Sequence, residues 1–545
     1  MLDLVPIGAD FAYCGKTLSE RVTGRFYTPD VLASELAQQM LEAFTDKGSD
    51  VPLRVIDPFS GDGQLVSALV IEASKYPSLR RRTWRISIWD RDQSALARAV
   101  ARIERLASML EITMTLESRV VDSFATELTS AYDLVITNPP WEHLKPDSRE
   151  MARMSSNDAA DYRQRLRAVS NALDDRFPNS KASGAWGGWA TNLARCGWDL
   201  SMQLLGKHGI LGIVLPSTLL GDQSSEQIRR LTFCRHHVLD VAAYPSEARL
   251  FERVDQPVVA MTIGATTTER SAPGRVRIFD ADRRVRHVVP IASPSDLASN
   301  GYAISVGFGA GASGALDCVQ RLPRLSEFEG TGPRDLWMGR ELDETRIFEK
   351  TVTGPHHPFV KGRMIARHTI AEHPVRSVRA DLASKFQSAA FHRAVWRDVS
   401  RPSQKRRMIG SVIPPGWITG NSLHVAHFRD GDLKRTLALH GLLSSLVLEF
   451  QVRSRLATGH MSLGAVRQSR VPELTRSVVA TLARGVTAVQ EGRSGAAVHL
   501  EVMVAKAYGL NRNTMEAIVG SFDKIEDEER GQLLDSALWS GGGAS

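Results

Sequence analysis

Asn138-Pro139-Pro140-Trp141 closes an apolar run that ends at Thr137 and is typical of a buried strand. Each proline fixes its own φ angle and donates no backbone hydrogen bond, so the turn is stiff. The Asn138 amide and the Pro139 carbonyl can therefore bind one planar polar group, beside which Trp141 offers a flat aromatic face. Asn-Pro and Pro-Pro also mark ordinary turns, so a plain strand-ending turn is the alternative.

Acidic residues and glycines follow other strand-like runs at the same kind of position. Asp57 precedes a turn that contains Gly61 and Gly63 and leads into a helix, while Asp90 and Asp122 follow the next two runs. Glycine lets the backbone approach a ligand closely, although a tight turn also explains it. The pattern is neither a GxGxxG fingerprint nor a P-loop. Asp90 stands where doubly wound folds bind ribose hydroxyls, and a helix N-cap is the alternative.

Regular alternation of strands and helices is expected to bring these side chains together. The strand-like runs are 53–57, 86–90, 112–116, 133–137, 209–216, 237–243 and 258–263. This order predicts an open parallel α/β sheet that is covered on both faces. Ligands bind such sheets at the carboxyl ends of the strands, which is where the polar residues lie. A helix over 31–44 is predicted as well, with Thr28 as its N-cap.

The remaining segments are less regular. Residues 141–190 form a long polar insert, which favours either a lid over a substrate or disordered surface. Alternation stops near residue 270, residues 275–475 are mixed, and 476–545 indicate helices. Basic residues are dense around Trp396, and they are Arg393, Arg397, Arg401, Lys405, Arg406 and Arg407. Such a cluster suits contact with DNA phosphates, and a solvated basic face is the alternative.

Bulk composition narrows the class of protein. The 545 residues are 43% hydrophobic and 24% charged, and the formal net charge of +7 fits a polyanionic partner only weakly. The cysteines are scattered without a CxxC pair, so neither a disulfide framework nor a zinc site is predicted. The N-terminus lacks the pattern of a signal peptide, and the longest apolar run, 209–220, is too short to span a bilayer. We expect a cytoplasmic protein without membrane association or a bound metal.

The order of the motifs resembles a known family. The motifs are GRFYTP at 24–29, DPFSGDG at 57–63, IWD at 88–90, VDSF at 121–124 and NPPW at 138–141. They resemble the gamma class of S-adenosylmethionine-dependent DNA adenine-N6 methyltransferases, which belong mainly to restriction–modification systems and include the TaqI-like enzymes. The resemblance covers 24–265 and implies a Rossmann-like, seven-stranded methyltransferase domain over 1–270. More loosely, it implies a mixed α/β target recognition domain over 271–475, before the helical C-terminal region 476–545.

The resemblance also implies roles for the site residues. The cofactor S-adenosylmethionine would be bound by Thr28, Asp57, Gly61, Gly63, Asp90 and Asp122. Within this set, Asp90 would bind the ribose hydroxyls and Asp122 the adenine amino group. The sequence departs from the family at Ser123, which precedes Phe124, and at Gly197 and Trp198, where the family has an aromatic residue earlier in the helix.

The NPPW motif would hold the base that is methylated. By resemblance, Asn138 and the Pro139 carbonyl accept hydrogen bonds from the target amino group, in a turn that Pro140 completes. Trp141 would stack on one face of the flipped base and Phe251 on the other. The implied reaction is methylation of the N6 amino group of an adenine in double-stranded DNA, as the modification component of a restriction–modification or related defence system.

Other functions fit parts of the same pattern. They are cytosine-N4 methylation of DNA, methylation of RNA or of a protein glutamine by the same core, and binding of DNA by a scaffold without activity. A large region after residue 265 argues against the RNA and glutamine enzymes, which usually lack one. No nuclease motif is recognised, so cleavage is expected from a separate restriction endonuclease. A specificity subunit is a further candidate partner.

Overall fold

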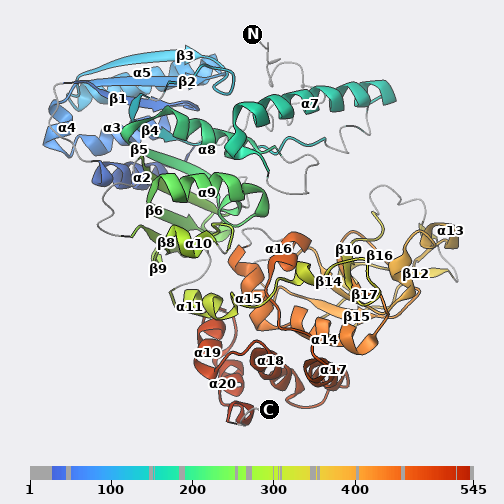
Figure 1. Cartoon of the computed structure of the whole chain (residues 1–545). Helices are drawn as coiled ribbons and strands as arrows, with labels where there is room; N and C mark the ends of the chain where they lie inside the picture. Colours follow the sequence, from blue (N-terminus) through green and yellow to red (C-terminus); the bar gives the residue numbers. More distant parts are fainter. Residues whose placement is uncertain are drawn as a thin grey trace. The chain divides into compact units, whose positions relative to one another are not determined.

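The chain divides into two compact units, 1–307 and 308–545 (Figure 1). The computed structural model describes residues 28–44, 51–129, 131–146, 151, 154–182, 191–251, 256–265, 273–298, 300–304, 306, 310–343, 351–352, 356–400, 404–455, 461–522 and 524–540. The domain boundary predicted between residues 270 and 271 lies inside the first unit, because two further strands continue its sheet.

A nine-stranded sheet forms the centre of the first unit, in the order β3-β2-β1-β4-β5-β7-β6-β8-β9. Its strands are β1 Leu53–Asp57, β2 Trp84–Asp90, β3 Met114–Val120, β4 Tyr132–Thr137, β5 Leu205–Pro216, β6 His237–Tyr244, β7 Val258–Gly264, β8 Arg275–Phe279 and β9 Val285–Pro290. Strands β1 to β5 are parallel, whereas β7 runs antiparallel to both β5 and β6. The predicted mostly parallel, Rossmann-like sheet is confirmed.

The predicted count of seven strands is wrong, because β8 and β9 extend the sheet beyond β6. Strand β8 pairs parallel with β6, and β9 pairs antiparallel with β8. Neither strand is a continuous apolar run: β8 carries Arg275 and Arg277, and β9 is almost entirely exposed. Strand β9 forms the edge of the sheet and needs no buried face on both sides, while the two arginines interrupt the apolar pattern of β8.

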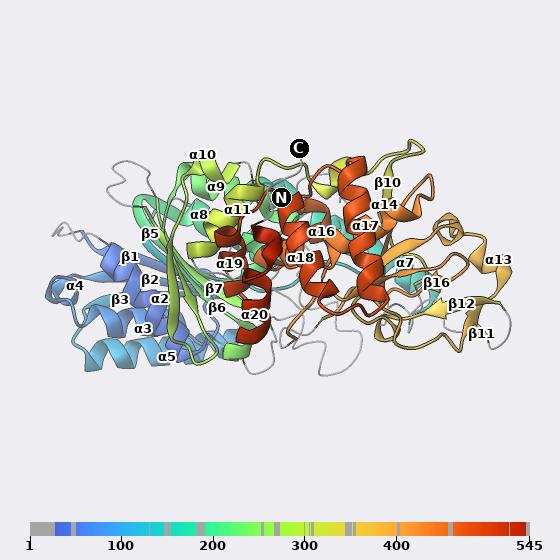
Figure 2. The ribbon, with the colours of Figure 1, turned by 90° about the horizontal axis from the view of Figure 1, so that it is seen from below.

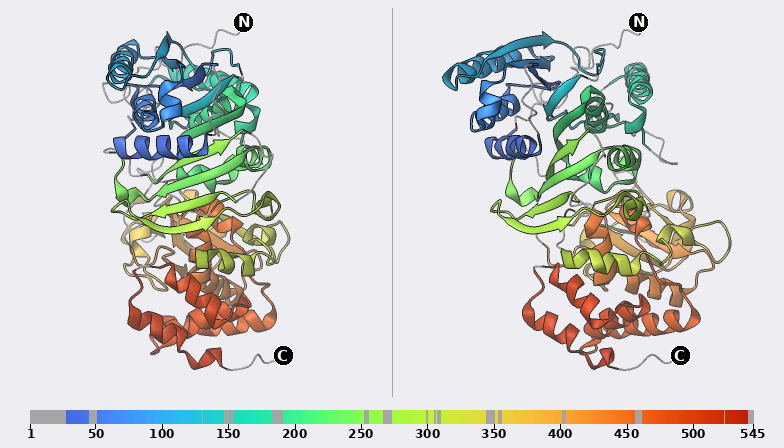
Figure 3. Two further views of the ribbon diagram at one scale, coloured as in Figure 1. Left: turned by 90° about the vertical axis from the view of Figure 1, so that its left-hand side faces the viewer. Right: turned by 60° about the vertical axis from the view of Figure 1, so that its left-hand side comes forward.

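Helices cover both faces of this sheet (Figure 3). Their bounds are α2 Asp30–Ala43, α3 Gln64–Ala73, α4 Pro77–Arg81, α5 Gln93–Met109, α7 Ser156–Arg176, α8 Leu193–Leu204, α9 Glu226–Arg235 and α10 Pro294–Ala298. On one face, α2, α3 and α5 bury Leu36, Val66 and Ile103. On the other, α8 and α9 bury Trp198 and Phe233. The predicted arrangement of helix layers around a central sheet is therefore confirmed.

Helix α7 occupies much of the polar insert. Ser155 caps it by accepting a hydrogen bond from the backbone N–H of Asp158 at 3.2 Å. Leu166, Val169 and Leu173 form a single buried stripe that packs into the core beside α8. The insert is thus a helix over 156–176, where the sequence predicted a lid or disordered surface. A narrow stripe at helical spacing is enough to hold it, although its composition is polar.

Two four-stranded sheets and a group of helices make up the second unit. The sheets have the orders β10-β17-β14-β15 and β11-β13-β12-β16. Their strands are β10 Leu336–Gly339, β11 Thr351–Val352, β12 His357–Val360, β13 Ser377–Val378, β14 Arg393–Arg397, β15 Gly410–Ile413, β16 Ile418–Thr419 and β17 Leu423–Phe428. The helices are α11 Ala310–Val319, α13 Ala380–Ala383, α14 Leu433–Leu443, α15 Leu446–Arg455, α16 Leu463–Gln468, α17 Arg476–Gln490, α18 Ala496–Ala507, α19 Arg512–Gly520 and α20 Asp527–Leu534.

The C-terminal helices share one core with the first of these sheets. Figure 2 shows α14 and α17 side by side, and their residues are in contact. Leu439 of α14, Leu482 of α17 and Trp396 of β14 are buried in the same cluster. The helical region predicted from residue 476 is therefore part of the second compact unit.

Among the described residues, no helix is both apolar and long enough to cross a bilayer. The described His, Cys, Asp and Glu side chains also form no group of three or more that could bind a metal ion.

Candidate active site

The carboxyl ends of β1, β2 and β4 lie next to one another, as the sequence predicted. Strand β1 pairs with β2 on one side and with β4 on the other. The hydroxyl of Thr137, the last residue of β4, donates to Asp57 Oδ1 at 2.8 Å. Asp57 is therefore bonded to the residue that immediately precedes the NPPW motif at the sheet edge.

Asp57 has a buried carboxyl group whose two oxygens differ in their hydrogen bonds. Its Oδ1 accepts hydrogen bonds from Phe59 N at 3.0 Å and from Thr137 Oγ1 at 2.8 Å. Its Oδ2 is buried and has no hydrogen-bond partner among the described residues. Burial raises the pKa of Asp57 to about 7, and the charge of Asp90 acts in the same direction. This carboxyl group suits a cationic ligand, because the positive charge would pair with the carboxylate and favour loss of its proton.

The glycine turn after β1 needs glycine at both positions. Gly61 and Gly63 have φ angles of 53° and 80°, in the left-handed region that other residues avoid. A Cβ on Gly63 would lie 2.8 Å from the Cβ of Ala99 in α5. The Gly61 N–H donates to Asp90 Oδ2 at 2.8 Å, so β2 holds the turn in place. Asp92, not Asp90, caps the following helix.

Asp122 follows β3 and lies beside the same turn. Its Oδ1 accepts from the backbone N–H of Phe124 at 3.0 Å, and its Oδ2 pairs with Arg91. The neighbouring Ser123 hydroxyl donates to a carbonyl group of the loop after β1. The Phe124 ring packs on Phe59 with centroids 5.0 Å apart. Ser123, which departs from the family pattern, thus ties the two loops together.

The NPPW turn places Asn138 against the segment that precedes α2. Pro139 is buried, while Asn138, Pro140 and Trp141 are half-buried. The side-chain Nδ2 of Asn138 donates to Thr28 Oγ1 at 3.1 Å, and Thr28 is only 6% exposed. The prediction that Thr28 caps the helix is wrong. Pro29 holds the N-cap position, and the Thr28 hydroxyl faces the NPPW turn instead.

Helix α8 covers the other side of the turn. A Cβ on Gly197 would lie 2.3 Å from the Cβ of Pro139, so only glycine fits at this contact. The N-terminus of α8 is fixed as well, because Leu193 N donates to Glu142 O at 2.8 Å. Asn192 caps the helix by accepting from two backbone N–H groups. Sequence reasoning missed the role of Gly197, although glycine within a helix often marks a close approach.

Trp141 and Phe251, which the resemblance places on opposite faces of a base, pack against each other in the structure. Their ring centroids are 5.1 Å apart and the rings are inclined by 67°. Phe251 is 6% exposed. A base stacked between two rings needs walls about 7 Å apart, twice the contact distance of roughly 3.5 Å. The two rings must therefore separate before a base can enter between them.

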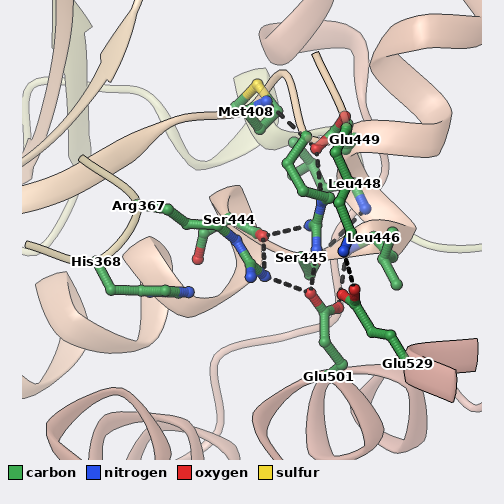
Figure 4. A network of polar contacts seen from close by, with 12 residues as sticks. Arg367, His368, Met408, Ser444, Ser445, Leu446, Leu448, Glu449, Glu501 and Glu529 are labelled. Atoms are coloured by element: carbon green, nitrogen blue, oxygen red, sulfur yellow. Dashed lines mark hydrogen bonds and ion pairs between the residues drawn. The ribbon is translucent and has the colours of Figure 1, made fainter. Parts of the chain in front are cut away.

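In the second unit, the basic residues around Trp396 are largely internal. Arg393 is fully buried and pairs with Glu341 at 2.7 Å. Arg406 is 8% exposed and pairs with Glu449 at 3.0 Å and with Glu501 at 2.8 Å. Figure 4 shows Glu449 and Glu501 in this buried network.

The other described members of the basic group also have partners within the protein or are buried. Arg407 is 6% exposed. Arg397 donates to the Ile365 carbonyl at 2.9 Å, and Lys405 pairs with Glu529. Arg401 lies outside the described residues. The predicted contact with DNA phosphates does not fit Arg393 and Arg406, because carboxylates distant in sequence neutralise both side chains inside the protein.

The fold is similar to those of several solved structures, whereas no protein-family model matches the sequence. The chain is similar to the type IIL restriction–modification enzyme MmeI in complex with DNA, with 10% identity, 92% of this chain and 73% of that chain covered, and a TM-score of 0.50. It is also similar to the type IIG restriction endonuclease BpuSI, with 13% identity, coverage of 95% and 67%, and a TM-score of 0.42.

A third similar structure is the type I restriction–modification methyltransferase subunit from Streptococcus thermophilus, with 16% identity, coverage of 52% and 60%, and a TM-score of 0.33. The chain spans 60–73% of the lengths of these three proteins. At 10% identity, the match to MmeI shows a likeness of fold alone, and it covers 92% of this chain.

Proposed function

We propose that this chain is an S-adenosylmethionine-dependent DNA methyltransferase of a restriction–modification system. Its substrate would be the N6 amino group of an adenine flipped out of double-stranded DNA. The observation that carries the proposal is the meeting of Asp57, the glycine turn and the NPPW motif at one sheet edge, joined by the 2.8 Å bond from Thr137 to Asp57. A binding loop for a cationic cofactor and a pair of hydrogen-bond acceptors would then face the same space.

The loops after β1 to β3 fit the cofactor. Asp57 Oδ2, which has no hydrogen-bond partner among the described residues, suits an ammonium group. The Gly61–Gly63 turn lets the backbone approach the cofactor closely. Asp90 and Asp122 keep lone pairs beyond their backbone contacts, because a carboxylate offers about four. We assign Asp90 to the ribose hydroxyls and Asp122 to the adenine amino group. When bound, S-adenosylmethionine supplies a methyl group on a positively charged sulfur.

The NPPW turn would orient the target amine. An exocyclic amine is a weak nucleophile because its lone pair is delocalised into the ring. Asn138 Oδ1 and the Pro139 carbonyl would accept its two N–H groups and direct the lone pair toward the cofactor. The gain is orientation together with stabilisation of the positive charge that develops on nitrogen. This chemistry requires neither a covalent nucleophile nor a metal.

Entry of the base would require Trp141 and Phe251 to separate. Flipping a base out of a duplex costs a few kcal/mol of unstacking. Stacking on aromatic side chains offsets that cost by about 1–3 kcal/mol per base. We propose that Trp141 and Phe251 exchange their contact with each other for contact with the two faces of the target base.

The second unit would read the DNA sequence. Support comes from the fold likeness to MmeI, which covers 92% of this chain. Phosphate contacts would come from surface residues other than the buried arginines. A separate restriction endonuclease or a specificity subunit would be the partner in the complete system.

The experiment that tests this proposal is long-read sequencing of DNA from cells that express the chain, with an Asn138→Ala variant as control. Hydrolysed DNA is analysed by mass spectrometry in parallel. We expect N6-methyladenine at one recurring sequence, and its absence with the variant. N4-methylcytosine would overturn the choice of base. Unmethylated DNA, with methyl transfer to RNA or to a protein glutamine by the purified chain, would overturn DNA as the substrate.

A further inference from the structure

We infer that Thr28 is a positioning residue for the Asn138 amide, and that it acts on catalysis through this amide. The resemblance placed Thr28 in a motif that binds the cofactor. In the structure, however, its hydroxyl accepts the Nδ2–H of Asn138 at 3.1 Å. The inference rests on the proposed function and assigns to Thr28 a role that differs from cofactor binding.

The orientation of this amide decides whether the site works. An asparagine side chain has an acceptor at Oδ1 and two donors at Nδ2. Only the oxygen can accept from a target amine, because the Nδ2–H groups would oppose the N–H groups of the substrate. The bond to Thr28 engages Nδ2 and holds the amide at a fixed place beside the segment before α2. Without the hydroxyl, the amide loses this partner and can leave the position in which Oδ1 would meet the target amine.

Both partners are rigidly held. Thr28 is β-branched, which restricts its χ1 angle, and it is buried directly before α2. Helix α2 docks on the sheet so closely that a Cβ on Gly212 of β5 would lie 2.1 Å from the sulfur of Met40. Asn138 follows Thr137, which is anchored to Asp57. The hydroxyl and the amide therefore meet at a position that two different elements determine.

The matched variants are Thr28→Val, which keeps the shape but removes the hydroxyl, and Thr28→Ser, which keeps the hydroxyl. Thr232→Val is the control, because Thr232 is a buried threonine of α9 whose hydroxyl bonds the Ile228 carbonyl at 2.8 Å. Single-turnover methyl transfer, KM for DNA, cofactor Kd and thermal unfolding are measured for each variant.

Thr28→Val should lower kcat by about 10- to 100-fold, which is somewhat less than the loss of a direct transition-state contact. The cofactor Kd and the KM for DNA should change by no more than about 2-fold, since neither ligand contacts this hydroxyl in the inferred arrangement. Thr28→Ser should restore most of the rate, and Thr232→Val should leave it unchanged. A parallel loss of cofactor affinity would overturn the inference, as would an unchanged kcat.

Thr28→Val in a variant of residue 138 tests whether Thr28 acts through that residue. In Asn138→Ala there is no amide for Thr28 to position. Thr28→Val should therefore cause little further loss of the residual single-turnover rate in the Asn138→Ala background. An equal loss in both backgrounds would show that Thr28 acts independently of residue 138, and would contradict the inference.

The results distinguish failure of the proposed function from failure of the inference about Thr28. If the wild-type chain transfers no methyl group to DNA, the proposed function fails, whatever Thr28 does. If the wild-type chain is active, Asn138→Ala is inactive and Thr28→Val is fully active, the function stands and the inference fails.

Discussion

The side-chain amide of Asn138 donates a hydrogen bond to the hydroxyl of Thr28 at 3.1 Å, across 110 positions of sequence. This bond links the segment before α2 to the carboxyl end of β4. On the other side of the turn, Gly197 of α8 contacts Pro139. The NPPW motif is therefore held from two sides by elements that lie outside the motif itself.

Binding of S-adenosylmethionine should depend on pH through Asp57. Burial raises the pKa of this carboxyl to about 7, so it carries a proton in the free protein below that pH. A bound ammonium group would favour the ionised form, so binding releases the proton. Affinity should therefore rise by up to about tenfold per unit as the pH increases from 5.5 to 7. Isothermal titration calorimetry in buffers of different ionisation enthalpy measures both the affinity and the released proton.

The matched variant for this prediction is Asp57→Asn, which keeps the size of the side chain and cannot ionise. Its affinity should be lower and nearly constant over the same pH range. A wild-type affinity that does not change between pH 5.5 and 7 would count against the role of Asp57.

Removal of one ring of the aromatic pair should impair base flipping. Phe251→Ala removes the ring whose centroid lies 5.1 Å from that of Trp141. Because base stacking is worth about 1–3 kcal/mol, kcat/KM for DNA should fall by roughly 5- to 150-fold. DNA with 2-aminopurine at the target position should also show a smaller fluorescence increase on binding.

Phe279→Ala is the control for this change, since Phe279 stacks on Tyr244 in the same unit with centroids 4.2 Å apart. It should lower thermal stability without affecting the 2-aminopurine signal. Equal flipping by wild-type protein and Phe251→Ala would exclude Phe251 as a stacking wall.

Arg406 should matter for stability and not for DNA binding. Arg406→Met would remove the cation that Glu449 and Glu501 share, which leaves Glu501 with Arg367 and Glu449 with the more distant Arg453. Loss of one partner of a buried ion pair typically lowers the free energy of unfolding by about 3–5 kcal/mol. Denaturant unfolding measures this loss, and Lys434→Met, which removes an exposed cation of α14, is the control.

The DNA affinity of folded Arg406→Met should depend on salt concentration in the same way as that of the wild-type protein. A phosphate contact would instead lower the slope of log K against log salt by about one. A lower slope of log K against log salt, together with unchanged stability, would indicate that Arg406 contacts DNA.

The features that could be predicted from sequence are those with a local pattern. Strands such as Leu53–Asp57 and Tyr132–Thr137 each contain a short buried apolar run, and a polar residue at the carboxyl end marks the ligand edge of the sheet. This local pattern is sufficient to assign Asp57, Asp90 and Asn138 to that edge.

The features that could not be predicted depend on partners distant in sequence. Arg393 looks like a surface cation in the sequence, yet Glu341, which is 52 positions away, neutralises it in the interior. The need for glycine at position 197 arises only from Pro139, which is distant in sequence and packs against it. In the same way, composition suggested a loop where three apolar side chains at helical spacing hold α7 on the core.

The central claim is that Asn138 orients the amine that receives the methyl group. The most direct measurement is single-turnover transfer of a tritiated methyl group to DNA by wild-type protein and Asn138→Ala, at saturating cofactor. We predict a rate loss of about 100-fold or more, with the cofactor Kd unchanged. Full turnover by Asn138→Ala would contradict the claim.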